Sequence, residues 1–198
     1  MHYTLADYVL DIAQNAVEAG SSSVKLLLDE ERTGTSVVIE DDGKGMGDEE
    51  LRRALDPFYT DGDKHARRKV GLGLPFLRQA TEQAHGDFAI ASKKGGGTRV
   101  SFRFPADDVD SPPLGDIPGL FLSALCLPGG HEMVIERRRA GPGSLGYRLV
   151  RSELSEAVGG LERASSLALL REYLTSQECD VLSQECDATS QEETEDGN

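Results

Sequence analysis

The sequence predicts an α/β (α+β) domain in which helices and short strands share the first half of the chain. Three observations support this fold class. The chain opens with apolar residues at helical spacing, which is typical of an amphipathic helix. Segments rich in β-branched or alternating apolar residues follow, as expected for strands. Turns rich in Gly, Asp and Pro separate these segments and mark where each element ends.

The first helix is expected at residues 4–19. Thr4 can cap its N-terminus, and Gly20 can end it. Its apolar stripe consists of Leu5, Tyr8, Val9, Ile12, Ala16 and Ala19. The elements after it are expected in the order strand, strand, short helix, helix, strand and strand, at residues 23–30, 36–40, 48–55, 75–84, 88–92 and 98–104.

The second half of the chain has weaker signals. Within it, a β-hairpin is expected at residues 132–138 and 147–154, and a helix at 155–174 that bends at Gly159–Gly160. This unit could mediate dimerisation, dock a partner or, as the default, pack on the sheet of the first domain. The expected units are a first domain, a linker, a small hairpin-plus-helix appendage and a tail, at residues 1–105, 106–116, 117–174 and 175–198.

The tail repeats a seven-residue pattern, written SQECDVL, SQECDAT and SQEETED. A seven-residue period suggests a coiled coil, but the repeat has too few apolar positions for a coiled-coil seam. It contains eight acidic residues and no Lys or Arg. This composition predicts a disordered acidic tail.

The net charge of the 198 residues is −14, and the tail contributes more than half of it. An acidic chain is a poor match for nucleic acid as a partner. Cys126, Cys179 and Cys186 have the spacing of neither a disulfide framework nor a metal site. No N-terminal apolar run resembles a signal peptide, and the apolar stretch at residues 117–127 is too short to span a bilayer. We therefore expect a cytoplasmic protein without membrane contact.

The first helix carries two polar residues that suggest chemistry. Asp11 and Asn15 lie four residues apart, so they share one helix face, and Glu18 lies roughly on the same face. An Asn oxygen can ligate Mg²⁺, and a carboxylate one turn earlier can orient or deprotonate a nucleophile. The alternative is an ordinary polar side of an N-terminal helix.

Two glycine-rich turns complete the pattern. DDGKGM follows the second strand, and its Gly43 and Gly45 would let the backbone approach a flat ligand closely. Gly71 and Gly73 expose successive amides before a helix N-terminus, which favours an anion. The loop before them is basic, although such a run is more often a solvated surface; its cations are Lys64, Arg67, Arg68 and Lys69.

Taken in order, these motifs resemble those of the GHKL ATPase superfamily, whose nucleotide pocket is the Bergerat fold. DIAQN resembles the N box, DDGKGM the G1 box, DPFYT the F box and VGLGL the G2 box. GGGTRVSF resembles the strand after the lid, which carries a nucleotide-site Thr. The resemblance covers roughly residues 5–105. It implies a two-layer sandwich, with a mixed sheet and helices on one face, that binds ATP and Mg²⁺.

The resemblance also implies roles for individual residues. Asp41 would accept the adenine amino group, Asn15 would hold Mg²⁺, and Asp11 would be the catalytic acid or base. Thr98 would reach the adenine side through water or directly. The amides of Gly71, Leu72 and Gly73 would bind the phosphates. The other residues implied to contact the nucleotide are Gly43, Gly45, Met46, Phe58, Lys69, Val70 and Leu74.

Within the superfamily, two branches share the motifs. PFYT and GLGLPFLRQATEQAHGDFAIAS look like the catalytic domain of sensor histidine kinases. NAVEAGSSSVKL looks like MutL mismatch-repair proteins and type II topoisomerases. The sequence departs from the kinase pattern at two positions. Glu18 stands where histidine kinases commonly have a basic residue, and Lys69 replaces the first Gly of the lid. Asp11 stands where Glu is common.

No phosphoacceptor histidine is apparent in the sequence. Ten residues precede Asp11, too few for the helical hairpin that carries such a histidine in kinases. The pair His131–Glu132 is the nearest imitation, but it is expected to begin a strand. The histidines His2, His65, His85 and His131 are therefore expected to be surface or structural residues.

Three functions follow from this pattern. The first is an ATP-binding module in signal transduction, which transfers a phosphoryl group to a partner protein or hydrolyses ATP. The second is an ATP-gated interaction switch, similar to anti-sigma factors, with little or no turnover. The third is a degenerate fold that no longer binds nucleotide. The intact motif residues favour the first two, and either could act as a homodimer.

Overall fold

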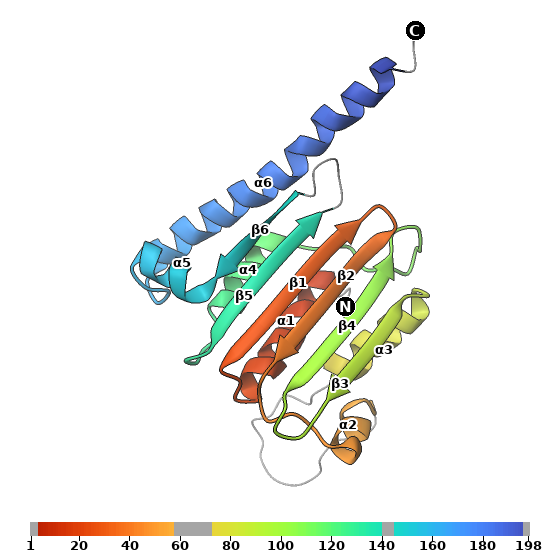
Figure 1. The fold of residues 1–198 in the computed structure, drawn as a ribbon, viewed down its shortest axis with the longest axis vertical. Coiled ribbons are helices and arrows are strands. Elements are labelled where there is room, and N and C mark those ends of the chain that lie inside the picture. Colours follow the sequence, from red (N-terminus) through yellow and green to blue (C-terminus); the bar gives the residue numbers. More distant parts are fainter. Residues whose placement is uncertain (1–3, 58–72, 140–144, 196–198) are drawn as a thin grey trace.

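The computed structural model describes residues 4–57, 73–139 and 145–195, and its strands form one six-stranded sheet (Figure 1). The strand order across the sheet is β3-β4-β2-β1-β5-β6. The strands are β1 (Ser23–Glu31), β2 (Gly34–Asp41), β3 (Asp87–Ser92), β4 (Thr98–Pro105), β5 (Glu132–Arg139) and β6 (Leu145–Val150). The helices are α1 (Leu5–Glu18), α2 (Asp48–Ala54), α3 (Gly73–Gln83), α4 (Ile117–Leu125), α5 (Arg151–Val158) and α6 (Ala164–Glu195).

The sheet is mixed, as expected. Strands β1 and β5 run parallel, and every other neighbouring pair is antiparallel. A strand cannot be brought parallel to its neighbour by a tight turn. Strand β5 follows β4 in the chain, and the connection passes through α4 and crosses to the other side of β1, where β5 pairs with β1.

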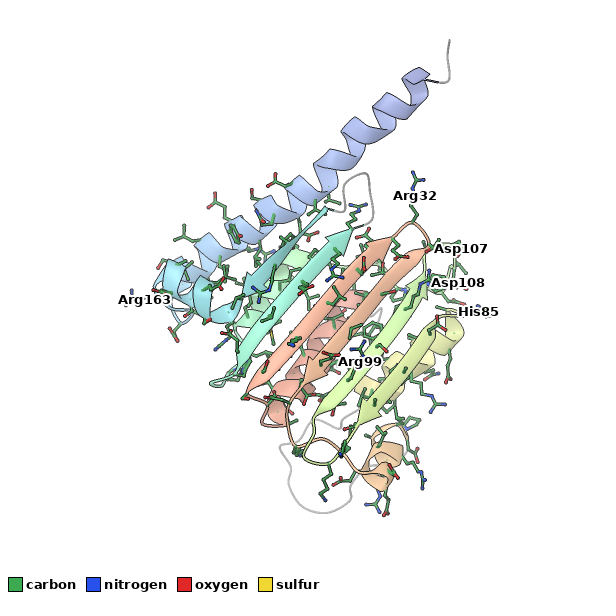
Figure 2. All side chains as sticks on the ribbon, in the orientation of Figure 1. Arg32, His85, Arg99, Asp107, Asp108 and Arg163 are labelled. Atoms are coloured by element: carbon green, nitrogen blue, oxygen red, sulfur yellow. The ribbon has the colours of Figure 1, made fainter. Side chains whose placement is uncertain are left out.

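Helices cover one face of the sheet, as Figure 1 shows for α1, α3 and α4. Alternate strand residues are buried on that face, which forms the core with the apolar sides of these helices. The opposite face is open and charged. There Lys25, Glu40 and Arg99 are neighbours in register across three strands, and Arg99 pairs with Glu40 (Figure 2). The structure confirms the predicted two-layer α/β architecture.

Helix α1 begins with the predicted cap. The Asp7 amide donates to Thr4 Oγ1 at 3.2 Å, and the Thr4 amide donates to Asp7 Oδ2 at 2.8 Å. This reciprocal capping box satisfies amides that the helix itself leaves without partners.

The segment expected as a linker is held against the domain. Two amides at the start of α1 donate to it: Leu5 N to the Pro113 carbonyl at 2.9 Å and Ala6 N to the Leu114 carbonyl at 3.0 Å. Next to them, an added Cβ at Gly115 would overlap Thr4, and Gly115 has a φ of +84°. Residues 113–115 therefore join α1 to the second half of the chain.

Helix α4 was not predicted, because its apolar sequence contains Pro118. The proline lies in the first helical turn, where no amide hydrogen is needed. Asp116 caps this helix by accepting a hydrogen bond from the Gly119 amide at 2.9 Å. The predicted hairpin does form as β5 and β6, but α5 begins directly after Val150.

Helix α6 extends through Glu195, whereas the sequence predicted disorder after residue 174. Two properties of the segment explain the difference. Residues 161–196 contain no Gly or Pro to end a helix. Its apolar residues Leu170, Leu174 and Val181 are also buried. In the described part of the chain, no helix is long and apolar enough to cross a lipid bilayer.

Candidate nucleotide-binding site

Three polar side chains form a row across adjacent strands at one end of the sheet. Ser92 of β3 pairs in register with Thr98 of β4, and Thr98 pairs with Asp41 of β2. Residues directly opposite each other in a sheet project from the same face. Buried Ile39 and Val100 lie two residues from Asp41 and Thr98, so the row projects from the helix-covered face. We call Asp41, Thr98 and Ser92 the polar row.

The Asp41 carboxylate is held by backbone amides. Its Oδ1 accepts a hydrogen bond from the Gly43 amide at 2.8 Å, and the Thr98 amide also bonds to the carboxylate. Partial burial raises the pKa of Asp41 above its ordinary value, although both amide hydrogen bonds act to lower it. The carboxylate is therefore a fixed and incompletely solvated acceptor.

The turn after β2 packs too tightly for side chains at its glycines. An added Cβ at Gly43 would lie 2.9 Å from Ala19 Cβ and 3.0 Å from the Ala19 carbonyl oxygen. Gly45 has a φ of +57°, and a Cβ there would overlap the Lys93 carbonyl. Both predicted glycines are thus required for the fold of this turn. Lys44 ties the turn to α1, because its amide donates to the Ala19 carbonyl at 3.1 Å.

Ser92 belongs to the site, and the sequence analysis missed it. Its Oγ accepts from the Met46 amide at 2.8 Å and lies 2.9 Å from Thr98 Oγ1. It therefore connects the turn after β2 to the Thr98 hydroxyl. The register of the β3–β4 hairpin is the signal that could have identified it, since that register places Ser92 opposite Thr98.

The helices bring two further motifs together. Asp11 and Asn15 are exposed on α1, and Gly73 begins α3. A Cβ added at Gly73 would overlap the Asp11 carboxylate, so the two residues are in close contact. The predicted acid thus lies at the N-terminus of the predicted phosphate-binding helix. Leu74 is half-buried and packs against the core behind it.

Glu18 is hydrogen-bonded within α1. Gln14 Nε2 donates to Glu18 Oε1 at 2.8 Å. This bond draws the carboxylate toward Gln14, which lies beside Asn15 in sequence but points about 100° away from it around the helix. The arrangement limits the repulsion between Glu18 and a phosphate near Asn15.

Several predicted contact residues lie outside the described residues, so their roles stay predictions. They are Phe58, Lys69, Val70, Gly71 and Leu72. The structure describes the other predicted site residues, which are Asp11, Asn15, Asp41, Gly43, Gly45, Met46, Gly73, Leu74 and Thr98.

The described residues fit a nucleotide with Mg²⁺. The half-buried acceptor at Asp41 suits a hydrogen-bond donor on a flat base. Within residues 4–57, 73–139 and 145–195, no group of three or more His, Cys, Asp or Glu residues is placed to hold a metal. Mg²⁺ often takes only one or two protein oxygens and completes its shell with phosphate and water. Asn15 could supply that protein oxygen.

The two described histidines differ, because one is buried and the other is exposed and paired with an aspartate. His131 is only 4% exposed. His85 Nδ1 lies 2.9 Å from Asp108 Oδ2, and both residues are labelled in Figure 2. Strand β5 begins at Glu132, directly after His131, and the buried imidazole is not accessible to a bulky phosphate donor.

Comparison with known families identifies the class. Residues 3–108, more than half of the chain, match the family model described as histidine kinase-, DNA gyrase B-, and HSP90-like ATPase. The chain belongs to this family, as its motifs predicted. Because this is the GHKL superfamily, the fold is the predicted Bergerat fold.

Curated proteins similar to this chain include histidine kinases. The sensor histidine kinase YxdK of Bacillus subtilis (strain 168) is 31% identical over 99 residues, which cover 47% of this chain and 30% of that protein. The histidine protein kinase DivJ of Caulobacter vibrioides is 37% identical over 70 residues, which cover 35% of this chain and 12% of that protein. The match thus spans less than a third of either relative.

A solved structure has a similar fold over more of the chain. It is described as the N-terminal domain of a DNA repair protein, and it matches with a TM-score of 0.50 at 11% identity. The match covers 83% of this chain and 58% of that structure. At this identity the likeness concerns the fold alone. Its extent exceeds that of the family match, so it reaches beyond the first domain.

Proposed function

We propose that this protein binds ATP with Mg²⁺ at the polar row and the adjoining turn. The observation that carries the proposal is the Asp41 carboxylate, which two backbone amides orient at the end of β2. It supplies an acceptor for the exocyclic amine of adenine. Gly43 lets the turn after β2 pack against Ala19 and places its own amide on the Asp41 carboxylate.

The remaining residues would act on the phosphates. Asn15 would hold Mg²⁺ through its side-chain oxygen, and the metal would offset phosphate charge. The amides of Gly71, Leu72 and Gly73 would donate to phosphate oxygens at the N-terminus of α3. Asp11, in contact with Gly73, would position the attacking nucleophile or accept its proton.

We place the phosphoryl acceptor on another protein or on water. Sensor histidine kinases are the relatives of this chain, and this supports kinase-type turnover. Among the described histidines, however, His131 is buried and His85 pairs with Asp108. The proposal is therefore an Mg-ATP-dependent kinase or ATPase that serves a cytoplasmic protein partner.

Incubation with γ-labelled ATP, with and without candidate partners, tests the turnover. The expected result is slow release of labelled phosphate, or label on a partner, from the wild-type protein. Asp11→Asn should lose both while it retains ATP binding. Glu18→Gln is a matched control, because it removes a carboxylate that lies two helical turns from Asp11 and is bonded to Gln14. ATP that binds but never loses its label would contradict the kinase or ATPase proposal.

An ATP-gated switch is the second candidate, and the position of α1 favours it. The same helix carries Asp11 and Asn15 and receives residues 113–114 at its first amides. A displacement of α1 on nucleotide binding would therefore reach the second half of the chain. Small-angle scattering with and without a non-hydrolysable ATP analogue tests this, and identical profiles would contradict it.

A further inference from the structure

The Ser92 hydroxyl makes three close polar contacts at the edge of the proposed base pocket. Its Oγ lies 2.8 Å from the Met46 amide nitrogen, 3.1 Å from the Gly97 carbonyl oxygen and 2.9 Å from Thr98 Oγ1. The residue is half-buried at the end of β3. Its three partners come from the turn after β2, from the β3–β4 turn and from β4.

Counting hydrogens gives the one arrangement in which all three contacts are hydrogen bonds. A serine hydroxyl has one hydrogen to donate and two lone pairs to accept with. The Met46 amide can only donate to Ser92, and the Gly97 carbonyl can only accept from it. All three contacts are hydrogen bonds only if Ser92 donates to Gly97 and Thr98 donates to Ser92. The reverse direction at Thr98 would break the bond from Ser92 to the Gly97 carbonyl, which would then keep only its bond from the Lys93 amide at 3.2 Å.

This direction determines what Thr98 offers to a ligand. Its single hydroxyl hydrogen is used on Ser92, so only its lone pairs remain for the pocket. Asp41, opposite Thr98 in register, is also an acceptor when ionised. The part of the polar row that faces a base thus consists of two neighbouring acceptors.

We propose that Ser92 is a positioning residue that makes this pocket select purines with an exocyclic amine over purines with a carbonyl at the same position. This inference rests on the proposed function. An amine has two hydrogens, one for Asp41 and one for Thr98. A carbonyl oxygen there would meet two acceptors and no donor. Without Ser92, the Thr98 hydroxyl could turn and donate to that carbonyl.

Inosine triphosphate is the matched probe, because it carries a carbonyl where ATP carries the amine. We would measure the dissociation constants of Mg-ATP and Mg-ITP by calorimetry for the wild type, Ser92→Ala, Ser92→Thr and Ser101→Ala. Ser101 lies on β4 with the opposite parity to Thr98, so it faces the open side of the sheet. Ser92→Thr keeps the hydroxyl. Thermal unfolding of each variant checks that it is folded.

The preference for ATP over ITP should fall roughly tenfold in Ser92→Ala, which is the ratio that one mispaired hydrogen bond typically carries. It should stay within about twofold of wild type in Ser92→Thr and Ser101→Ala. Thr98→Val should lower it to a similar extent as Ser92→Ala. Adding Ser92→Ala to Thr98→Val should then change little, because both residues act through one hydroxyl hydrogen.

Three outcomes would overturn the inference. An unchanged ATP-to-ITP ratio in Ser92→Ala, with ATP still bound, would remove the role of Ser92 and leave the binding site intact. Equal weakening of both nucleotides would reduce Ser92 to a structural residue of the turn. Failure of the wild type to bind ATP would overturn the proposed function as well.

Discussion

The helix-covered side of the sheet carries two polar clusters, one near each edge, and they differ in what they leave open. The polar row lies on β2, β4 and β3 at the lower end of the sheet in Figure 1. The second cluster joins β1, β5, β6 and α6, and we call it the arginine cluster. It consists of Arg137, Glu30, Glu178 and Tyr147.

The arginine cluster is closed. Arg137 is 1% exposed, and its guanidinium bonds to Glu30, to Glu178 and to the Arg138 carbonyl. The Tyr147 hydroxyl donates to Glu178, and burial together with this carboxylate raises the pKa of Tyr147 far above its ordinary value. Each charge has its partner inside the protein, so this cluster can hold α6 on the sheet but has nothing left to bind a ligand.

The side chains of the polar row are oriented by hydrogen bonds but keep unused hydrogen-bonding capacity. Backbone amides orient the Asp41 carboxylate, and Ser92 orients Thr98, but no described cation pairs with Asp41. The difference teaches that burial of polar groups alone does not mark a binding site. A site needs oriented groups whose remaining hydrogen-bonding capacity is unused.

The largest expected effect comes from breaking the arginine cluster. Arg137→Met removes one partner and leaves the carboxylates of Glu30 and Glu178 poorly compensated. We expect a loss of about 3–5 kcal/mol in the free energy of unfolding, measured with urea. Arg138→Met is the control, because Arg138 pairs with Glu136 at the surface and should cost less than about 1 kcal/mol. Equal losses in the two variants would show that the cluster does not stabilise the fold.

A second substitution should disturb the proposed nucleotide site and leave the free energy of unfolding nearly unchanged. In Gly73→Ala, the added Cβ must displace either Asp11 or the start of α3. Such a displacement should lower ATP turnover by roughly tenfold or more. Stability should be unchanged or slightly higher, because Ala favours helices over Gly by about 1 kcal/mol. Gly130→Ala is the control, since its Cβ would meet no atom within 4 Å. Full activity in Gly73→Ala would argue against a role for this contact.

His131 is a third case: a buried polar side chain without a hydrogen-bond partner among the described residues. Among the described residues neither of its ring nitrogens has a hydrogen-bond partner. Burial lowers the pKa of His131, Arg151 lowers it further, and Glu132 opposes both. The pKa of His131 is lower in the folded protein than in the unfolded chain. The stability that His131 contributes is therefore present above about pH 6.5 and is lost as the pH falls through the folded pKa.

His131→Leu should therefore reduce the dependence of stability on pH between about pH 7 and pH 5. At pH 7 it should raise the free energy of unfolding by about 1 kcal/mol, because two unsatisfied polar atoms are removed. Urea unfolding at several pH values measures both effects. A variant with the wild-type pH dependence would contradict this assignment.

The smallest expected effect is on the stability of the folded protein when Asp41 is replaced. The pKa of Asp41 is raised from its ordinary value of 3.8, so its ionised form is disfavoured in the folded protein. Its contribution to stability is then fully present below pH 3.8 and is lost as the pH rises through the folded pKa. Asp41→Asn should be slightly more stable than wild type at pH 7, by roughly 1–3 °C in the melting temperature. The difference should shrink toward pH 4, and a less stable variant at pH 7 would contradict it.

The sequence predicted well those features that depend on neighbouring residues. The cap at Thr4, the strands of the first domain and the glycines that allow close packing at Gly43 and Gly45 are local properties of the chain. The motif order also predicted the family. Among these motifs, DDGKGM directly follows β2 and Gly73 begins α3, so both glycine-rich turns lie at element boundaries.

Features that depend on distant pairing were missed. Ser92 enters the site only through the register of β3 and β4. The acidic repeat is helical at its start partly because Glu178 meets Arg137 and Tyr147, which lie 41 and 31 residues away. Composition alone could not indicate those partners. Helix α4 has a local signal that is ambiguous, because a proline such as Pro118 interrupts a helix in its interior but is tolerated in its first turn.

Calorimetric titration of Mg-ATP into the wild type, Asp41→Asn and Tyr147→Phe tests the central claim most directly. Both substitutions alter a partly or fully buried polar group on the same side of the sheet, but only one lies in the polar row. We expect the wild type and Tyr147→Phe to bind with similar affinity and Asp41→Asn to bind at least tenfold more weakly. No binding to the wild type, or equal binding by Asp41→Asn, would contradict the assignment of the polar row as the nucleotide site.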